Sequence, residues 1–517
     1  MKQILFIAFL VMTTSLFGQS VSSHLPVINI QSSGEIPDEP RIQGTMGIMS
    51  NSNMNSSDGP FNEYNGDIGI EIRGNSSQDF DKKSYTIELR DNSGNAMSQS
   101  LLGMGADSEW VLHALFIDKT LLRIPMSFYL HEQMGESVCS WQYVEVVVND
   151  DYKGIYALIE KIRQGAERVN IADINAIDNT GGYLFKVDWV NEEEASFNSE
   201  YSSMGGPRTT FEYIYPKGSQ VTIKMESFIE QRMYDWESAL FSTNFINAKG
   251  EHYTKWIDSE SFASFLLINE FSKNSDGYKL SSYFHKDNDG LDPRFHAGPI
   301  WDFDQTYGLS AVCSNSNPRG WTFLQNQPGC EDLENMPLWW EHLTKDPSFC
   351  NLITTDWTQY RNSFLNKDSL YIWIDNHVNY LGDAITRNFE RWNIIGEDVW
   401  IVDYETPTTY EGEITYMKNW IDHRLAWMDS NIGNICAFNN QDGMVNVFPN
   451  PANDIITVKM VPGSYTAITD IGGRLMAIHN ESYSSSFSLD ISSWSAGIYI
   501  VFVRTTRGTY IQKFVKV

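Results

Sequence analysis

Residues 274–308, NSDGYKLSSYFHKDNDGLDPRFHAGPIWDFDQTYG, contain two acidic sites joined by a predicted β-hairpin. Asp276 stands in a turn, and the run 278–285 that follows alternates and is rich in aromatic residues, which is typical of a strand. A polar turn, residues 286–290, separates this run from residues 295–301. The two segments are expected to pair in an antiparallel manner.

Antiparallel pairing brings the outer ends of the two segments together, and with them Asp276 and the pair formed by Asp302 and Asp304. Carboxylates that converge in this way repel one another unless a cation or a shared proton lies between them. The stretch therefore predicts a metal-dependent site.

The same stretch resembles the signature of the CotH (spore-coat protein H) kinase family, in Asp276-Gly-Tyr and in Gly298-Pro-Ile-Trp-Asp302-Phe-Asp. The resemblance extends upstream, so that it covers roughly residues 40–430. The upstream pieces are Ile72-Arg73-Gly74-Asn75-Ser76-Ser77 with Lys82-Lys83-Ser84-Tyr85, Asp118-Lys119-Thr120 with Arg123, and Gly154-Ile-Tyr-Ala-Leu-Ile-Glu160-Lys161.

This resemblance implies an atypical protein-kinase-like fold and the transfer of the γ-phosphate of ATP to Ser or Thr of a protein substrate. Asp276 then corresponds to the catalytic aspartate, and Asp302, assisted by Asp304, to the ligand of Mg²⁺ or Mn²⁺. ATP follows from the resemblance alone, because the chain has neither a P-loop of the GxxxxGK[ST] type nor a His-Arg-Asp catalytic loop.

Three further residues are candidates for binding the nucleotide. The small-residue turn 74–77 can bring backbone N–H groups close to phosphate oxygens, with Arg73 and Lys83 supplying positive charge. In a kinase-like site a lysine that contacts the phosphates is steadied by a glutamate, and Glu160 is the expected partner of Lys83. Lys82 is expected to add charge at the same turn or to be a solvated surface residue.

The composition limits the class of protein. The chain has a net charge of -29, which argues against a nucleic-acid partner and disfavours anionic membranes. Residues 1–18 are interpreted as a secretory signal peptide, and no later segment is predicted to span a membrane. Among five cysteines, Cys313 and Cys330 could form a disulfide in an exported protein, and the odd count leaves at least one thiol unpaired.

The chain is expected to contain two folded parts. Residues 19–435 form the α+β kinase-like domain, residues 436–444 are a polar linker, and residues 445–517 alternate as in a small all-β sandwich. This tail resembles the C-terminal sorting domain of the type IX secretion system of Bacteroidota. The motifs are Val447-Phe-Pro-Asn-Pro-Ala-Asn453, Asp470-Ile-Gly-Gly-Arg474 and Gly497-Ile-Tyr-Ile-Val501. The resemblance implies export through the periplasm, binding to the secretion machinery, and a secreted or cell-surface location.

Strands are expected at residues 68–72, 84–89 and 110–116, and a hairpin at residues 144–159. A helix is expected at residues 118–134, capped by Asp118, with Arg123 as a surface partner of that cap. The other expected helices are residues 224–244, 254–270, 331–343, 346–387 and 414–428.

Two other functions stay open on the sequence. A non-catalytic surface or matrix protein could bind Ca²⁺ through residues 287–292, which resemble part of a calcium loop, or polysaccharide through its tryptophans. Asp276 and Asp302 could also be the acid/base pair of a glycosidase, at a separation that the sequence does not fix.

Overall fold

The computed structural model describes most of the chain. The described residues are 20–174, 177, 179–189, 194–202, 208–324, 336–436, 446–460, 465–479, 486–505 and 508–517. The predicted signal peptide and all but the first residue of the predicted linker lie outside them. The contacts divide the chain into a first unit, residues 1–172, 298–316 and 364–421, and a second unit, residues 173–297, 317–363 and 422–517.

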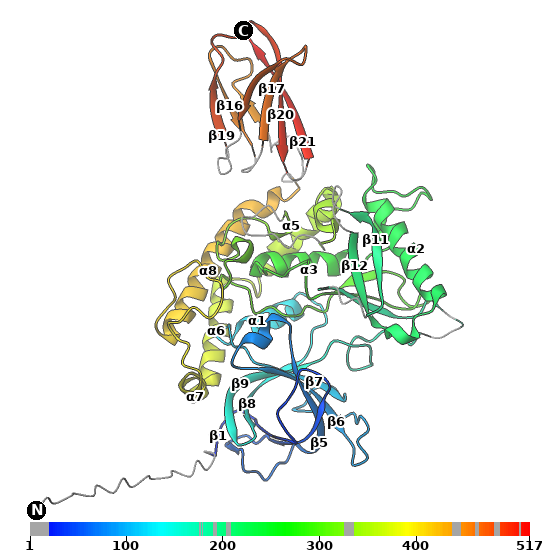
Figure 1. The fold of residues 1–517 in the computed structure, drawn as a ribbon, viewed down its shortest axis with the longest axis vertical. Coiled ribbons are helices and arrows are strands. Elements are labelled where there is room, and N and C mark those ends of the chain that lie inside the picture. Colours follow the sequence, from blue (N-terminus) through cyan, green and yellow to red (C-terminus); the bar gives the residue numbers. More distant parts are fainter. Residues whose placement is uncertain are drawn as a thin grey trace, which may run out of the picture. The chain divides into compact units, whose positions relative to one another are not determined.

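Seven strands of the first unit close into a barrel in the order β2-β3-β5-β6-β7-β9-β8 (Figure 1). They are β2 (Val27–Ser32), β3 (Ile42–Met49), β5 (Tyr64–Arg73), β6 (Ser84–Arg90), β7 (Glu109–His113), β8 (Trp141–Val148) and β9 (Asp151–Glu160), beside a small ladder of β1 (Ser22–Ser23) and β4 (Asn55–Ser56). The barrel closes through the parallel pairing of β2 with β8, while its other neighbours are antiparallel. Alternate apolar side chains fill its interior as a core.

The strands predicted at residues 68–72 and 84–89 lie within β5 and β6, and the predicted hairpin at 144–159 is β8 and β9. The strand predicted at 110–116 ends earlier, at His113. Mixed helices and sheets are confirmed as the fold class. The closed barrel was not predicted from the sequence, because its closing pair joins residues far apart in the chain.

The helices of the first unit are α1 (Arg123–Gln133), α6 (Lys367–Leu381), α7 (Asp383–Arg391) and the first part of α8 (Tyr410–Asn431), with the short turns η1 (Ser76–Asp79) and η4 (Val312–Ser314). Lys82 joins α7 to the barrel, because its ammonium group donates to Asn388 Oδ1 at 3.1 Å and to the carbonyl of Ile155. Lys82 is 2% exposed, and burial lowers the pKa of its ammonium group. Lys82 is therefore neither a surface charge nor part of a phosphate-binding turn.

The second unit contains a five-stranded sheet in the order β11-β12-β10-β13-β14. Its strands are β10 (Tyr183–Val187), β11 (Ser196–Ser202), β12 (Arg208–Tyr215), β13 (Ser282–Lys286) and β14 (Phe295–Ala297). Its helices are α2 (Ile223–Leu240), α3 (Ser259–Ser272), α4 (Trp339–Leu343), α5 (Pro347–Arg361) and the end of α8, with the short turns η2 (Gly218–Gln220), η3 (Tyr253–Lys255), η5 (Thr322–Leu324) and η6 (Ile432–Asn434).

The predicted central hairpin is confirmed, because β13 pairs antiparallel with β14 and Phe284 lies opposite Ala297. Its first strand begins at Ser282, four residues later than predicted. The backbone of Tyr278 and Ser281 adopts positive φ angles of 73° and 46°, which continue the turn and exclude a strand there.

The predicted helices exist with shifted ends. Residues 346–387, predicted as one helical segment, form three helices. Gly382, with a φ of 47°, separates α6 from α7. Part of the prediction at 331–343 lies outside the described residues, and α4 begins at Trp339. Tryptophan side chains form part of the core of the second unit, since Trp236, Trp339 and Trp340 are at most 1% exposed. They are therefore not a carbohydrate-binding platform.

The cysteines follow the prediction only in part. Cys350 and Cys436 form a disulfide that was not predicted, with 5.9 Å between their Cα atoms. Cys313 is disulfide-bonded, and its predicted partner Cys330 lies outside the described residues. Cys139 is free and buried, which agrees with the expected unpaired thiol.

The C-terminal tail consists of two antiparallel sheets, β15-β16-β19 and β18-β17-β20-β21 (orange to red in Figure 1). The strands are β15 (Asn446–Phe448), β16 (Ile455–Lys459), β17 (Tyr465–Asp470), β18 (Leu475–His479), β19 (Ser486–Asp490), β20 (Gly497–Thr505) and β21 (Gly508–Lys516). Inward-facing residues of both sheets form one apolar core of their own, including Ile456, Val458, Val501 and Phe514. The predicted all-β tail is confirmed. Across the described parts of the chain, every helix is too short or too polar to cross a membrane.

Candidate functional site

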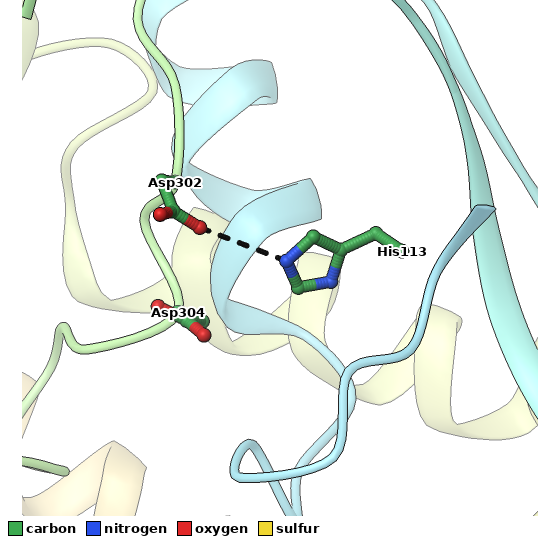
Figure 2. A group of neighbouring side chains, drawn as sticks. All are labelled: His113, Asp302 and Asp304. Carbon is green, nitrogen blue, oxygen red and sulfur yellow. Dashed lines mark ion pairs between the residues drawn. The ribbon is translucent and has the colours of Figure 1, made fainter. Parts of the chain in front are cut away.

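Three side chains of the first unit form a group that a single cation could contact. His113, Asp302 and Asp304 each offer one nitrogen or oxygen atom, and these atoms lie within 4.8 Å of one another. Nε2 of His113 is 3.6 Å from Oδ1 of Asp302 (Figure 2). All three residues are half-buried, so a ligand can reach them. The structure thus brings together both carboxylates that the sequence analysis proposed for the metal.

The local backbone fixes how these side chains are presented. His113 is the last residue of β7, where the next N–H, that of Ala114, donates to Oγ of Ser84 at 3.0 Å. Asp302 lies in the segment after β14 with a φ of 61°, which is the left-handed conformation. Aspartate is among the few residues other than glycine that adopt this conformation readily. The tight bend sends the Asp302 carboxylate toward His113.

The segment that follows the two carboxylates is anchored to the start of α1. Arg123 Nε donates to the carbonyl of Thr306 at 2.8 Å, and Ser127 Oγ lies 3.1 Å from the hydroxyl of Tyr307. Thr306 Oγ1 in turn donates to the carbonyl of Phe303 at 2.6 Å. The loop around Asp302 and Asp304 therefore has its own set of buried hydrogen bonds.

The prediction for Asp118 and Arg123 is corrected in two respects. The helix begins at Arg123 rather than at Asp118, because the Asp118 carboxylate turns back to accept the N–H groups of Thr120 at 3.0 Å and Arg123 at 2.8 Å. Arg123 is not a surface partner, since both it and Asp118 are 0% exposed and their side chains form an ion pair.

Replacing Arg123 with methionine is expected to lower the free energy of unfolding by about 3–5 kcal/mol, because it leaves the Asp118 carboxylate buried without its partner. Urea-induced unfolding of the full chain measures this loss. The matched control is the double variant Asp118→Asn with Arg123→Met, which buries no charge and should regain part of the stability. A single variant as stable as the wild type would show that the pair does not hold this segment.

Arg73 lies next to the metal candidates. It ends β5, and its guanidinium stacks over the ring of Trp301 at 5.2 Å from the centroid. Trp301 directly precedes Asp302. The guanidinium of Arg73, which can bind phosphate, therefore lies near the carboxylates that can bind a metal. The Nη1 atom of Arg73 is buried and has no hydrogen-bond partner within the described residues.

The predicted pair of Lys83 with Glu160 does not form. Glu160 instead pairs with Arg168 at 2.8 Å. Lys83 Nζ donates to the carbonyl of Gln78 at 2.6 Å and to that of Phe80. Lys83 thereby closes the loop that follows Gly74.

The register of the barrel explains this difference. Through β7, Glu160 lies level with Ile87, because both residues pair with Trp110. Ile87 is four residues from Lys83, which corresponds to about 13 Å along a strand at roughly 3.3 Å per residue. A sequence pattern that identifies the two strands does not reveal this offset, because β7 lies between them.

Asp276 lies in the second unit, in the turn after α3, as predicted. Its N–H donates to Oδ1 of Asn274 at 3.2 Å, and its carbonyl accepts the N–H of Leu280 at 2.9 Å. These backbone contacts hold Asp276 in the turn, and its side chain is half-buried. Asp302 and Asp304 lie in the first unit, and their convergence with Asp276 stays a prediction.

A buried network supports the turn that carries Asp276. Glu270, on α3, accepts the hydroxyl of Tyr278 at 2.9 Å and the N–H groups of Thr322 and Phe323 at 2.8 Å each. Arg424 donates to the carbonyl of Glu270 at 2.8 Å and to its carboxylate at 3.3 Å. Burial raises the pKa of Glu270, which these donors and the Arg424 cation oppose. The sequence analysis missed both residues, because they are far apart in the chain and match no motif.

The calcium-loop resemblance at residues 287–292 is not supported by the contacts of its carboxylates. Asp289 pairs with Lys286 at 2.6 Å and with Arg232. Asp292 pairs with Arg294 at 2.7 Å, whose hydrogen bond is the main reason that the pKa of Asp292 is lowered. Carboxylates neutralised by basic side chains are poorly placed to bind Ca²⁺ as well.

His113 is the group member that the sequence analysis did not single out. It lies 189 residues before Asp302 and was interpreted only as part of a strand. Its position at the end of an alternating run, where a side chain can face a loop, is the one local signal. That signal is weak, because a histidine at a strand end is common.

Comparison with known proteins adds three findings. The profile of the CotH kinase protein family matches residues 70–428, and that of the secretion system C-terminal sorting domain matches residues 446–517. No curated protein matches the chain. A solved structure of PorZ, a bacterial surface component of the type-IX secretion system of Porphyromonas gingivalis, matches at 23% identity and a TM-score of 0.13 over 15% of this chain and 12% of that one. Such a short match supports no argument.

The family match spans more than half of the chain and includes every site residue that the sequence analysis named. The sorting domain accounts for the separate β tail and directs the protein to the cell surface or the medium, in contact with the type IX secretion machinery. The chain is therefore an exported member of the CotH kinase family.

Proposed function

We propose that this protein is an atypical protein kinase, which transfers the γ-phosphate of ATP to Ser or Thr of a secreted or surface protein in a metal-dependent reaction. The observation that carries the proposal is the juxtaposition of Asp302 and Asp304 with His113 and Arg73 in one unit. Membership of the CotH kinase family supports the use of a nucleotide. The similarity of this fold to that of protein kinases is part of the same proposal.

The donor set fits a hard divalent cation. Asp302 and Asp304 offer carboxylate oxygens, the ligands that Mg²⁺ and Mn²⁺ prefer. Both residues are half-buried, which leaves room for phosphate oxygens and water to complete the coordination. A bound cation neutralises charge on the phosphate groups.

The residues of the chain would divide the remaining work. Arg73, stacked on Trp301, would bind phosphate oxygens beside the carboxylates. Lys83 would act by holding the loop 74–80 in place, since its ammonium group is engaged with two carbonyls of that loop. Asp276 would accept the proton of the acceptor hydroxyl, or orient it, as the oxygen attacks phosphorus.

The test is incubation of the mature protein with labelled ATP and Mn²⁺ or Mg²⁺, with a panel of exported proteins as acceptors. We expect labelled Ser or Thr that disappears when a chelator is added. Absence of label together with absence of nucleotide binding would favour a non-catalytic surface protein.

The tail is expected to be dispensable for the reaction. Its sheets form a core of their own, so deleting residues 441–517 should abolish delivery to the cell surface and leave phosphotransfer unchanged. Immunodetection on intact cells measures delivery, and the labelling assay measures transfer. An insoluble or inactive truncated protein would show that the tail is part of the catalytic fold.

A further inference from the structure

The imidazole of His113 is held in one tautomer by the backbone that follows it. The N–H of Leu115 donates to Nδ1 of His113 at 3.2 Å. Leu115 is 1% exposed, and its φ of 52° turns the chain back toward the ring. A buried N–H needs an acceptor, and Nδ1 can accept only while it carries no proton. The proton of the neutral imidazole is therefore on Nε2.

Nε2 is also the ring atom that faces the carboxylates, 3.6 Å from Oδ1 of Asp302 (Figure 2). A metal ion binds a ring nitrogen that has no proton. Histidines that bind a metal generally donate their other N–H to a carboxylate or carbonyl, which fixes the required tautomer. His113 has the opposite arrangement, because its other nitrogen accepts a hydrogen bond.

We infer that His113 is a phosphate-binding residue rather than a ligand of the metal. Asp302 and Asp304 hold the cation, and the Nε2–H group of His113 donates to an oxygen of the phosphate that the cation brings. This role rests on the proposed function. The distance of 3.6 Å to Asp302 exceeds the usual 2.7–3.2 Å of such a bond, so Asp302 does not saturate this donor.

The surroundings agree with this assignment. Arg73 presents its guanidinium over Trp301, the residue before Asp302, so two donor groups accompany two carboxylates. Donors recognise the anionic oxygens of a phosphate, while carboxylates recognise the cation. Neither donor group would contribute to the binding of a cation alone.

The first test measures the tautomer in the full chain, labelled with ¹⁵N at its ten histidines. The spectrum of His113→Gln identifies the signals of His113 by their loss. We expect a protonated Nε2 and an unprotonated Nδ1, both before and after Mg²⁺ is added. A protonated Nδ1 in the metal-free protein overturns the inference, whatever the protein does with nucleotides.

The second test separates metal from phosphate with Mn²⁺ as the probe. Pulsed electron paramagnetic resonance of the wild type with Mn²⁺ should show no directly bound nitrogen. His113→Leu should keep the affinity for Mn²⁺ alone but lose about tenfold or more in affinity for Mn²⁺–ATP, the worth of a hydrogen bond to a charged group. Asp304→Asn is the matched comparison, since it should weaken binding of Mn²⁺ itself.

The outcomes distinguish the two proposals. A bound nitrogen that is absent in His113→Gln, or a loss of Mn²⁺ affinity in His113→Leu, overturns the role of His113 and leaves the metal site standing. Failure of the wild type to bind Mn²⁺ overturns the proposed metal site and this role with it.

Discussion

Replacing Asp302 with alanine is expected to abolish metal-dependent nucleotide binding. Asp302 supplies one of the two carboxylates of the group with His113 and Asp304, and the methyl side chain of alanine cannot contact a cation. Partners in the outer shell of a metal are worth roughly 10–100-fold in affinity, so loss of an inner ligand should cost more. Calorimetric titration with ATP and Mn²⁺ measures the effect.

Two companion variants make this result specific. Asp302 has a positive φ of 61°, a conformation that asparagine tolerates better than alanine, so Asp302→Asn separates the loss of charge from backbone strain. Asp58→Ala removes an exposed carboxylate elsewhere in the same unit and should leave binding unchanged. Unchanged affinity in both Asp302 variants would rule out the metal role of this residue.

Replacing Asp276 with asparagine is expected to lower phosphotransfer by roughly 10²–10⁴-fold, the usual worth of a positioned acid–base group. Asparagine keeps the shape and hydrogen bonding of aspartate but lacks the basic carboxylate. Affinity for ATP should hardly change, because in the proposed site the phosphates would be bound by the groups around Asp302. Turnover and ATP affinity of the same variant are the two quantities to compare.

Asp276→Asn is expected to remove the carboxylate without disturbing the turn. The turn at Asp276 is made by its backbone and by Asn274 Oδ1, and Glu270 with Arg424 secures the segment behind it. Asparagine also keeps the shape of the side chain, so we expect the fold to stay intact, and an unchanged unfolding midpoint is the control. Full activity of Asp276→Asn would leave this residue as a turn former and contradict its proposed catalytic role.

Local patterns in the sequence predicted the elements that carry the site. The central hairpin depends on alternation within a few residues, and β13 pairs with β14 as that pattern indicates. The turn at Asp276 and the tail of alternating strands follow from equally local signals. These features could be found because neighbouring residues determine them.

Features that depend on register or on distant pairs could not be found in this way. Lys83 and Glu160 were matched by charge, but β7 lies between their strands and offsets them by four residues. His113 meets Asp302 only because the chain folds back over 189 residues, and Arg123 becomes buried only when it anchors Thr306. A sequence lists such residues but does not state which of them meet.

The transfer of phosphate itself is tested most directly by giving the mature protein ATP labelled on the γ-phosphate and, in parallel, ATP labelled on the α-phosphate. The two ATP samples differ only in which phosphorus carries the label. The sample that labels the acceptor therefore shows which phosphate group was transferred. The proposed mechanism predicts that label from the γ position appears on Ser or Thr of an acceptor protein, in the presence of Mn²⁺ or Mg²⁺ and not in Asp276→Asn. Label that arrives from the α position, or from neither position, would contradict it.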